Sequence, residues 1–94
     1  MANLGTVTKQ VAEVKEYTRD FATELVETSA VSIASATVTV SPSGLTVTAS
    51  VTSTKSIINY SSGTNGTNYK VTLLTTTDNG LIYEDELYVN IEDI

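Results

Sequence analysis

Few residues in this chain have side chains that could carry out a reaction. The best pair is Ser53 and Lys55, a hydroxyl and an amine that could act as nucleophile and base. Only their spacing supports this role, because no oxyanion-binding loop or buried-lysine pattern accompanies them. The 94-residue chain also lacks histidine, cysteine and tryptophan, which excludes histidine-based triads, thiol chemistry and disulfide scaffolds. We therefore expect no catalytic residue and no enzymatic activity.

Acidic residues near the C-terminal end of the chain raise the question of a metal site. Glu84, Asp85 and Glu86 are consecutive, with Glu92 and Asp93 close behind, and calcium prefers about six to eight oxygen ligands. On a strand, the first and third of the consecutive carboxylates point to one face and the second to the other, so too few converge. We predict solvated charges that protect an edge strand from pairing, with no metal and no cofactor.

The charge of the chain limits its partners. Five basic and eleven acidic residues give a net charge of −6. Phosphate backbones and anionic membrane surfaces both repel an acidic protein, so we expect no nucleic-acid and no membrane partner. No apolar run of about 18 residues could span a bilayer, and no secretory leader is present, which predicts a soluble chain made in a cytoplasm. The acidic segments 13–27 and 84–93 favour a basic partner surface or, more simply, solvated faces.

Any interaction surface of this chain must be positioned by its secondary structure, and the composition is typical of β-strands. From about residue 29 onward, threonine, serine, valine and isoleucine dominate. Residues 45–54 alternate most clearly, with apolar side chains at 45, 47, 49 and 51 and hydroxyl side chains between them. Further strands are expected over residues 31–40, 56–61, 69–77 and 81–94.

Three local signals interrupt these strands. Apolar parity changes between residues 31–33 and 38–40, which predicts a β-bulge near Ser35. The sequence SPSG at 41–44 predicts a turn, because proline fixes φ and glycine permits a positive φ. Asn79-Gly80 predicts a hairpin with a type I′ turn, in which both residues have a positive φ.

The first 28 residues are harder to assign. Apolar residues between Val11 and Leu25 have spacings close to those of a helix, whereas residues 14–21, VKEYTRDF, alternate as a strand does. We favour the strand, because a sandwich of this length needs a first strand. Residues 1–12 show no periodicity and are expected to form a flexible N-terminal arm, either mobile or ordered only on a partner.

Short strands separated by turns predict one all-β domain, a β-sandwich over residues 13–94. The segment GTNGTNYKV at 63–71 bears on the kind of sandwich. In immunoglobulin-like sandwiches, a tyrosine near the start of a late strand bonds through its hydroxyl to upstream backbone and locks a corner between the sheets. Gly66 and Tyr69 are candidates for this structural corner, the alternative being a glycine-rich hairpin with an ordinary tyrosine. We predict an immunoglobulin-like β-sandwich with a flexible N-terminal arm.

The stretch SSGTNGTNYKVTLLTTTDNGLIYEDELYVNI resembles the C-terminal half of the small phage fibre-tail adaptor proteins. That family shows a glycine-rich turn, a Tyr-x-Val strand, a short hairpin, an acidic position and a last apolar alternation. Upstream, EVKEYTRDF and TVTVSPSGLTV are similar to the family's first half. Tyr17, Asp20 and Phe21 stand at its Tyr-x-x-Asp-aromatic positions, although the aromatic there is often tryptophan. The resemblance covers residues 13–91.

The resemblance implies a virion component, an immunoglobulin-like module present in many symmetry-related copies, without catalysis or cofactor. We expect an adaptor at the head-to-tail or collar region of a tailed phage, assembled in the host cytoplasm, with portal, adaptor, tail or fibre proteins as partners. The alternatives are a capsid decoration protein of the same fold and a carbohydrate-binding, adhesin-like module. Tyr60, Tyr83 and Tyr88 are the expected interface residues, since tyrosine gives a large contact area at low entropic cost.

Overall fold

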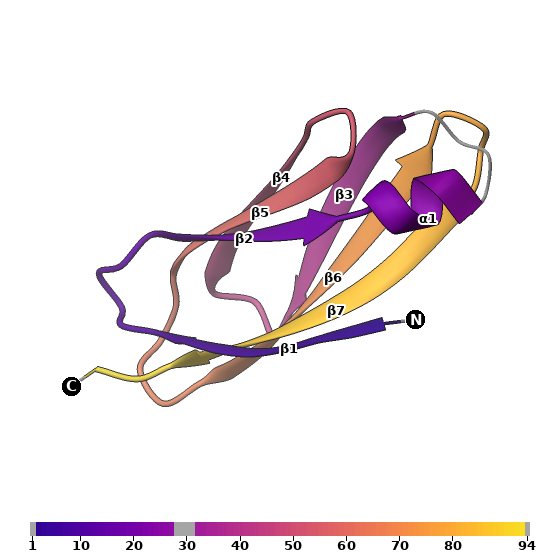
Figure 1. Cartoon of the computed structure of the whole chain (residues 1–94). Helices are drawn as coiled ribbons and strands as arrows, with labels where there is room; N and C mark the ends of the chain where they lie inside the picture. Colours follow the sequence, from indigo (N-terminus) through magenta and orange to yellow (C-terminus); the bar gives the residue numbers. More distant parts are fainter. Residues whose placement is uncertain (1, 28–31, 94) are drawn as a thin grey trace.

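The computed structural model describes residues 2–27 and 32–93, which form two β-sheets packed face to face (Figure 1). The order of strands is β1-β7-β6-β3 in the four-stranded sheet and β2-β5-β4 in the three-stranded sheet. The prediction of an all-β sandwich is confirmed. The elements are β1 (Ala2–Lys9), β2 (Lys15–Asp20), α1 (Ala22–Glu27), β3 (Ile33–Ser41), β4 (Leu45–Val51), β5 (Lys55–Ser62), β6 (Asn68–Thr77) and β7 (Ile82–Ile91).

The core lies between the two sheets and follows from the alternation of each strand. Along β6, every second side chain from Tyr69 to Thr77 is buried. The neighbouring β7 contributes three further buried apolar residues, and β4 and β5 supply the facing layer from the other sheet. The main cluster of buried residues is Leu45, Ile58, Tyr60, Tyr69, Val71, Leu73, Leu87, Val89 and Ile91.

The strand order matches that of a constant-type immunoglobulin sandwich in all but one strand. Such domains place their first, second, fifth and fourth strands in one sheet and their third, sixth and seventh in the other. Here β2, β5 and β4 form the first set and β3, β6 and β7 the second, but β1 joins β7 in parallel. The immunoglobulin-like designation stays a prediction, which this order supports.

The prediction of a flexible arm is wrong for residues 2–9. They form β1, which runs beside β7 in the same direction, in a register from Ala2 with Asp85 to Lys9 with Ile91 (Figure 1). A bulge between residues 3 and 5 shifts the alternation of β1. Leu4 and Val7 therefore both pack against the core, although their spacing fits no simple period.

The ambiguous segment after this strand contains both structures that its pattern suggested. Residues 15–20 form β2, which confirms the strand prediction. The short helix α1 follows, where the Asp20 carboxylate accepts a hydrogen bond from the Ala22 N–H at 2.9 Å. Phe21 and Leu25 are buried with Ile33 in a second cluster at this end of the sandwich.

The bulge and the turn around β3 are confirmed. The register between β3 and β6 shifts between Ile33 and Ser35, while Val31 lies outside the described residues. The turn at 41–44 carries the chain from the four-stranded to the three-stranded sheet, and its glycine, Gly44, has a φ of 123°.

The hairpin between β6 and β7 is confirmed, but its predicted type I′ turn is wrong. A positive φ occurs at Gly80 (86°) and not at Asn79. The Gly80 N–H donates to the Thr77 carbonyl at 3.1 Å, and the Thr77 N–H donates to the Leu81 carbonyl at 2.8 Å. This pattern is that of a turn followed by a glycine bulge, which needs a positive φ at one residue only.

Candidate protein interface

The three tyrosines predicted to lie at an interface have different positions. Tyr60 is 3% exposed and belongs to the main core cluster, so its prediction as an interface residue is wrong. With one phenylalanine and no tryptophan, the sandwich uses tyrosine to fill core volume. Tyr83 is half-buried, with its ring centroid 5.5 Å from that of Phe21. Tyr88 is half-buried on the outer face of the four-stranded sheet.

Tyr88 belongs to an ordered polar cluster on that outer face. The Lys70 Nζ lies 2.7 Å from Glu86 Oε2, and the Tyr88 hydroxyl donates to the same oxygen at 3.3 Å. The hydrogen bond from Lys70 lowers the pKa of Glu86, and the same bond raises the pKa of Lys70. This cluster neutralises a carboxylate that is only 8% exposed, so a partner can cover it without leaving that charge unpaired.

The prediction that the acidic run at 84–86 protects an edge strand is wrong, and its solvation holds for Glu84, which is exposed, but not for the buried Asp85 and Glu86. β7 lies between β1 and β6, so it is an inner strand of its sheet. Asp85 is 2% exposed, and its Oδ2 lies 3.4 Å from Nε of Arg19, which comes from β2 in the opposite sheet. The guanidinium carbon of Arg19 is also 4.3 Å from the centroid of the Phe21 ring. The ion pair therefore lies between the two sheets and connects β2 with β7.

Gly66 and Tyr69, the predicted structural corner, lie at the start of β6. Tyr69 is 1% exposed, and its hydroxyl accepts a hydrogen bond from the Thr64 N–H at 3.0 Å. Hydrogen bonds from the side chain and backbone of Thr64 lower the pKa of Tyr69. Gly66 has a φ of 82°, and its N–H donates to the Ile91 carbonyl at 2.8 Å. That these contacts lock the corner of the sandwich stays a prediction.

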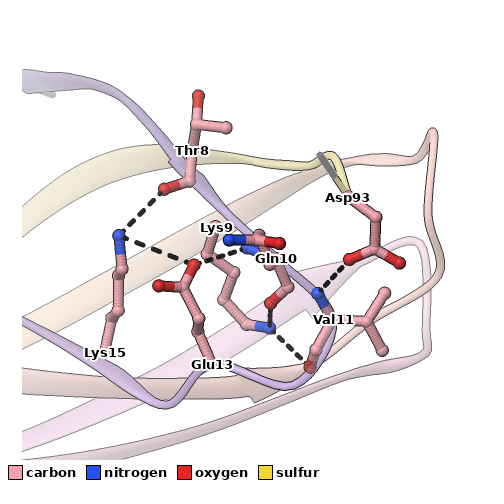
Figure 2. A network of polar contacts seen from close by, with 7 residues as sticks. All are labelled: Thr8, Lys9, Gln10, Val11, Glu13, Lys15 and Asp93. Carbon is pink, nitrogen blue, oxygen red and sulfur yellow. Dashed lines mark hydrogen bonds and ion pairs between the residues drawn. The ribbon is translucent and has the colours of Figure 1, made fainter.

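A polar network joins the beginning and the end of the chain (Figure 2). Lys9 is 1% exposed, and its Nζ donates to the carbonyls of Gln10 (2.6 Å) and Val11 (3.1 Å). The Val11 N–H in turn donates to Asp93 Oδ1 at 2.9 Å. Burial of the Lys9 amine lowers its pKa. The lysine thus acts as a structural tie for the turn between β1 and β2.

The structure does not arrange the candidate pair of Ser53 and Lys55 as a buried site. Ser53 and Lys55 lie exposed around the turn between β4 and β5, so no burial activates the amine. Within residues 2–27 and 32–93, no three His, Cys, Asp or Glu side chains gather as a metal site. In the same ranges, no helix is long and apolar enough to cross a membrane.

The open edges of the sheets are the remaining surfaces. β1 and β3 are the edge strands of one sheet, and β2 and β4 are those of the other. β2, with the sequence KEYTRD, is rich in charge, whereas β3 and β4 contain no charged residue and the only charge of β1 is the buried Lys9. Edge strands without charge are sites where another strand can pair.

A family model described as podophage GP4 fiber-tail adaptor protein gp77 (Gp77) matches residues 9–90. The chain belongs to the Gp77 family. The matched range begins at the last residue of β1 and ends one residue before the end of β7, so it covers both sheets apart from most of β1. Among curated proteins, none matches the chain. The resemblance to the fibre-tail adaptors is confirmed.

Two features of this Gp77-family chain escaped sequence reasoning. The buried pair of Arg19 and Asp85 and the buried Lys9 look like ordinary surface charges in the sequence. The position of Lys9 two residues after Val7 on one strand would have indicated an inward side chain, had β1 been recognised as a strand.

Proposed function

We propose that the chain is a non-enzymatic structural component of a podophage virion, an adaptor that links tail or fibre parts at the head-to-tail or collar region. The observation that carries this proposal is the match of the Gp77 fibre-tail adaptor model to residues 9–90. The family description names the adaptor role, and the role of this chain follows from membership. Its partners are other tail or fibre proteins of the particle, bound through protein–protein contacts.

The shape and the edges of the sandwich support this role. The principal extents of the chain are 45, 20 and 18 Å, so the sandwich is elongated. One copy can therefore bind one partner at each end and bridge the distance between them. Three of the four edge strands have no exposed charge along their length, and main-chain pairing at such edges can hold an extended segment of another protein. Weak contacts of this kind gain strength when symmetry repeats them around a particle.

Two other functions would fit a small β-sandwich. A carbohydrate-binding module would need exposed aromatic platforms, but all five tyrosines lie in the described part of the chain and none is exposed. A capsid decoration protein could share this fold and differs from the adaptor only in where it binds. The tyrosines argue against the first alternative, and the family description favours the adaptor over the second.

Particles assembled with and without the chain distinguish an adaptor from a decoration protein. We expect a deletion of its gene to give DNA-filled heads whose fibre content, measured by quantitative mass spectrometry of purified particles, falls sharply. Complementation with the intact chain should restore the fibres. Deletion particles with a normal fibre content and weakened capsids would instead support the decoration role and contradict the adaptor role.

A further inference from the structure

The two adjacent edge strands β3 and β4 contain no charged residue. Residues 28–54 contain no aspartate, glutamate, lysine or arginine, although the chain has five basic and eleven acidic residues elsewhere. In the structure this stretch supplies β3 and β4, which lie beside each other as the edges of the two sheets. The opposite side of the three-stranded sheet ends in the charged β2.

β4 has none of the features that keep an edge strand from pairing. Natural edges are blunted by charge, proline or a bulge. β4 has seven residues, LTVTASV, and pairs with β5 over its whole length without a register shift. β3 differs, because it has a bulge between Ile33 and Ser35 and ends directly before Pro42. β4 is therefore the more regular open edge on the uncharged side.

An apolar side chain at the end of β4 is left uncovered. Val51 has the inward parity of Leu45, yet it is 37% exposed whereas Leu45 is 5% exposed. A further strand beside β4 would place a side chain opposite this valine and cover it.

Electrostatics favours a second copy of this chain as the occupant. Two chains with a net charge of −6 repel each other over most of their surfaces, but the β4 edge brings no like charges together. Continuing the three-stranded sheet into a second copy also brings the two β3 edges toward each other. The absence of charge from β3 as well as β4 is consistent with that approach.

The sequence of β4 is also complementary to itself when the two strands are antiparallel. A two-fold axis at Thr48 pairs all seven residues, with Thr48 opposite its own counterpart and Thr46 opposite Ser50. Threonine and serine then lie opposite each other on the outer face, a favourable cross-strand pairing. On the inner face, Leu45 lies opposite Val51 of the second copy.

We propose that β4 pairs antiparallel with β4 of a second copy, about a two-fold axis at Thr48, and joins two three-stranded sheets into one sheet of six strands. A single strand-to-strand contact buries little area, so the pair is weak in dilute solution and fills at high local concentration. The inference depends on the proposed adaptor role in one respect only: assembly into a particle supplies the high local concentration at which the pair forms. Both tests below use the isolated chain, so their failure would leave the particle experiments unaffected.

Disulfide trapping tests the pairing and its register, because the chain has no cysteine of its own. In Thr48→Cys the two thiols lie directly opposite, within reach of a disulfide. Thr46→Cys in the same strand places them about 14 Å apart, and Thr18→Cys places one on the exposed face of β2. We expect Thr48→Cys to form covalent dimers at least about tenfold faster than either control. Equal rates at Thr48 and Thr18 would overturn the pairing, and faster trapping at Thr46 would overturn the register.

A charge at the same position gives a second test that needs no covalent bond. Analytical ultracentrifugation of the wild-type chain, over a concentration series reaching the millimolar range, should show a monomer–dimer equilibrium. Thr48→Lys should weaken this association at least about tenfold, because two lysines then meet at the axis. Thr18→Lys makes the same change on the opposite edge and should leave the association unchanged. A wild-type chain that stays monomeric throughout, or Thr48→Lys that dimerises like wild type, would overturn the proposal.

Discussion

At the scale of single residues, the Tyr69 hydroxyl ties the loop before β6 to the core. It accepts the Thr64 N–H at 3.0 Å while its ring is 1% exposed. It also lies close to Gly44, where a Cβ atom would be 3.0 Å from the hydroxyl oxygen. One side chain thus touches two loops, the one that leaves β3 and the one that enters β6.

We expect Tyr69→Phe to lower the unfolding midpoint by about 2 to 8 °C, since it removes one hydrogen bond and keeps the ring. Tyr88→Phe is the matched control, because its hydroxyl makes one long hydrogen bond on a half-buried face and should change the midpoint by less. Thermal unfolding followed by circular dichroism measures both. Midpoints that change equally in the two variants would contradict a structural corner at Tyr69.

Two glycines of the same loop allow the cost of backbone strain to be measured separately from the cost of a steric clash. Gly63 and Gly66 both have positive φ values, 100° and 82°, so alanine is strained at either position. A Cβ at Gly63 would lie 2.7 Å from Cγ1 of Ile91, whereas a Cβ at Gly66 meets no atom within 4 Å. We expect Gly66→Ala to cost about 1 to 2 kcal/mol of unfolding free energy and Gly63→Ala at least about 1 kcal/mol more. Urea denaturation that gives equal losses would show that Ile91 does not constrain the loop.

The pair of Lys70 and Glu86 predicts a dependence of stability on pH. Because Lys70 lowers the folded-state pKa of Glu86 below its usual value of 4.5, the carboxylate stabilises the fold above that value. This contribution disappears as the pH falls through the lowered pKa. Lowering the pH from 7 to 3 should therefore reduce the urea midpoint of the wild type more than that of Lys70→Gln. Lys55→Gln, on an exposed side chain, should behave like wild type, and an identical acid loss in Lys70→Gln would contradict the coupling.

At the scale of elements, β1 is part of the sandwich although the family model begins only at its last residue. Its side chains Leu4 and Val7 pack against the main core. Removing residues 1–8 should lower the unfolding free energy by about 2 to 4 kcal/mol, the value of two partly buried apolar side chains. Thr6→Ala, on an exposed position of the same strand, is the control and should have little effect. A truncated chain as stable as wild type would restore the interpretation of this segment as an arm.

Elements whose signals are local could be predicted from the sequence, and those that depend on distant partners could not. The alternation of β4, the bulge before Ser35 and the hairpin at Gly80 each follow from neighbouring residues. β1 was missed because its partner β7 lies about 80 residues away and a bulge at Gly5 disrupts its alternation. Tyr60 and Asp85 were misplaced for a related reason, since alternation gives the face of a side chain but not which face is buried.

At the scale of the whole molecule, the sandwich combines a charged side with an uncharged one. The β2 edge carries both signs of charge, while the β3 and β4 edges carry none. An adaptor of this kind can present different chemistry to different neighbours. In our account the uncharged β4 edge meets a second copy, and the other edges are available to tail or fibre proteins.

The most direct test of the central claim is a cryo-electron-microscopy reconstruction of a podophage particle that encodes this chain. We predict density for the two-sheet sandwich at the head-to-tail or collar region, in many symmetry-related copies, each in contact with a tail or fibre protein. Absence of the chain from purified particles, or its presence only on the capsid surface, would contradict the account.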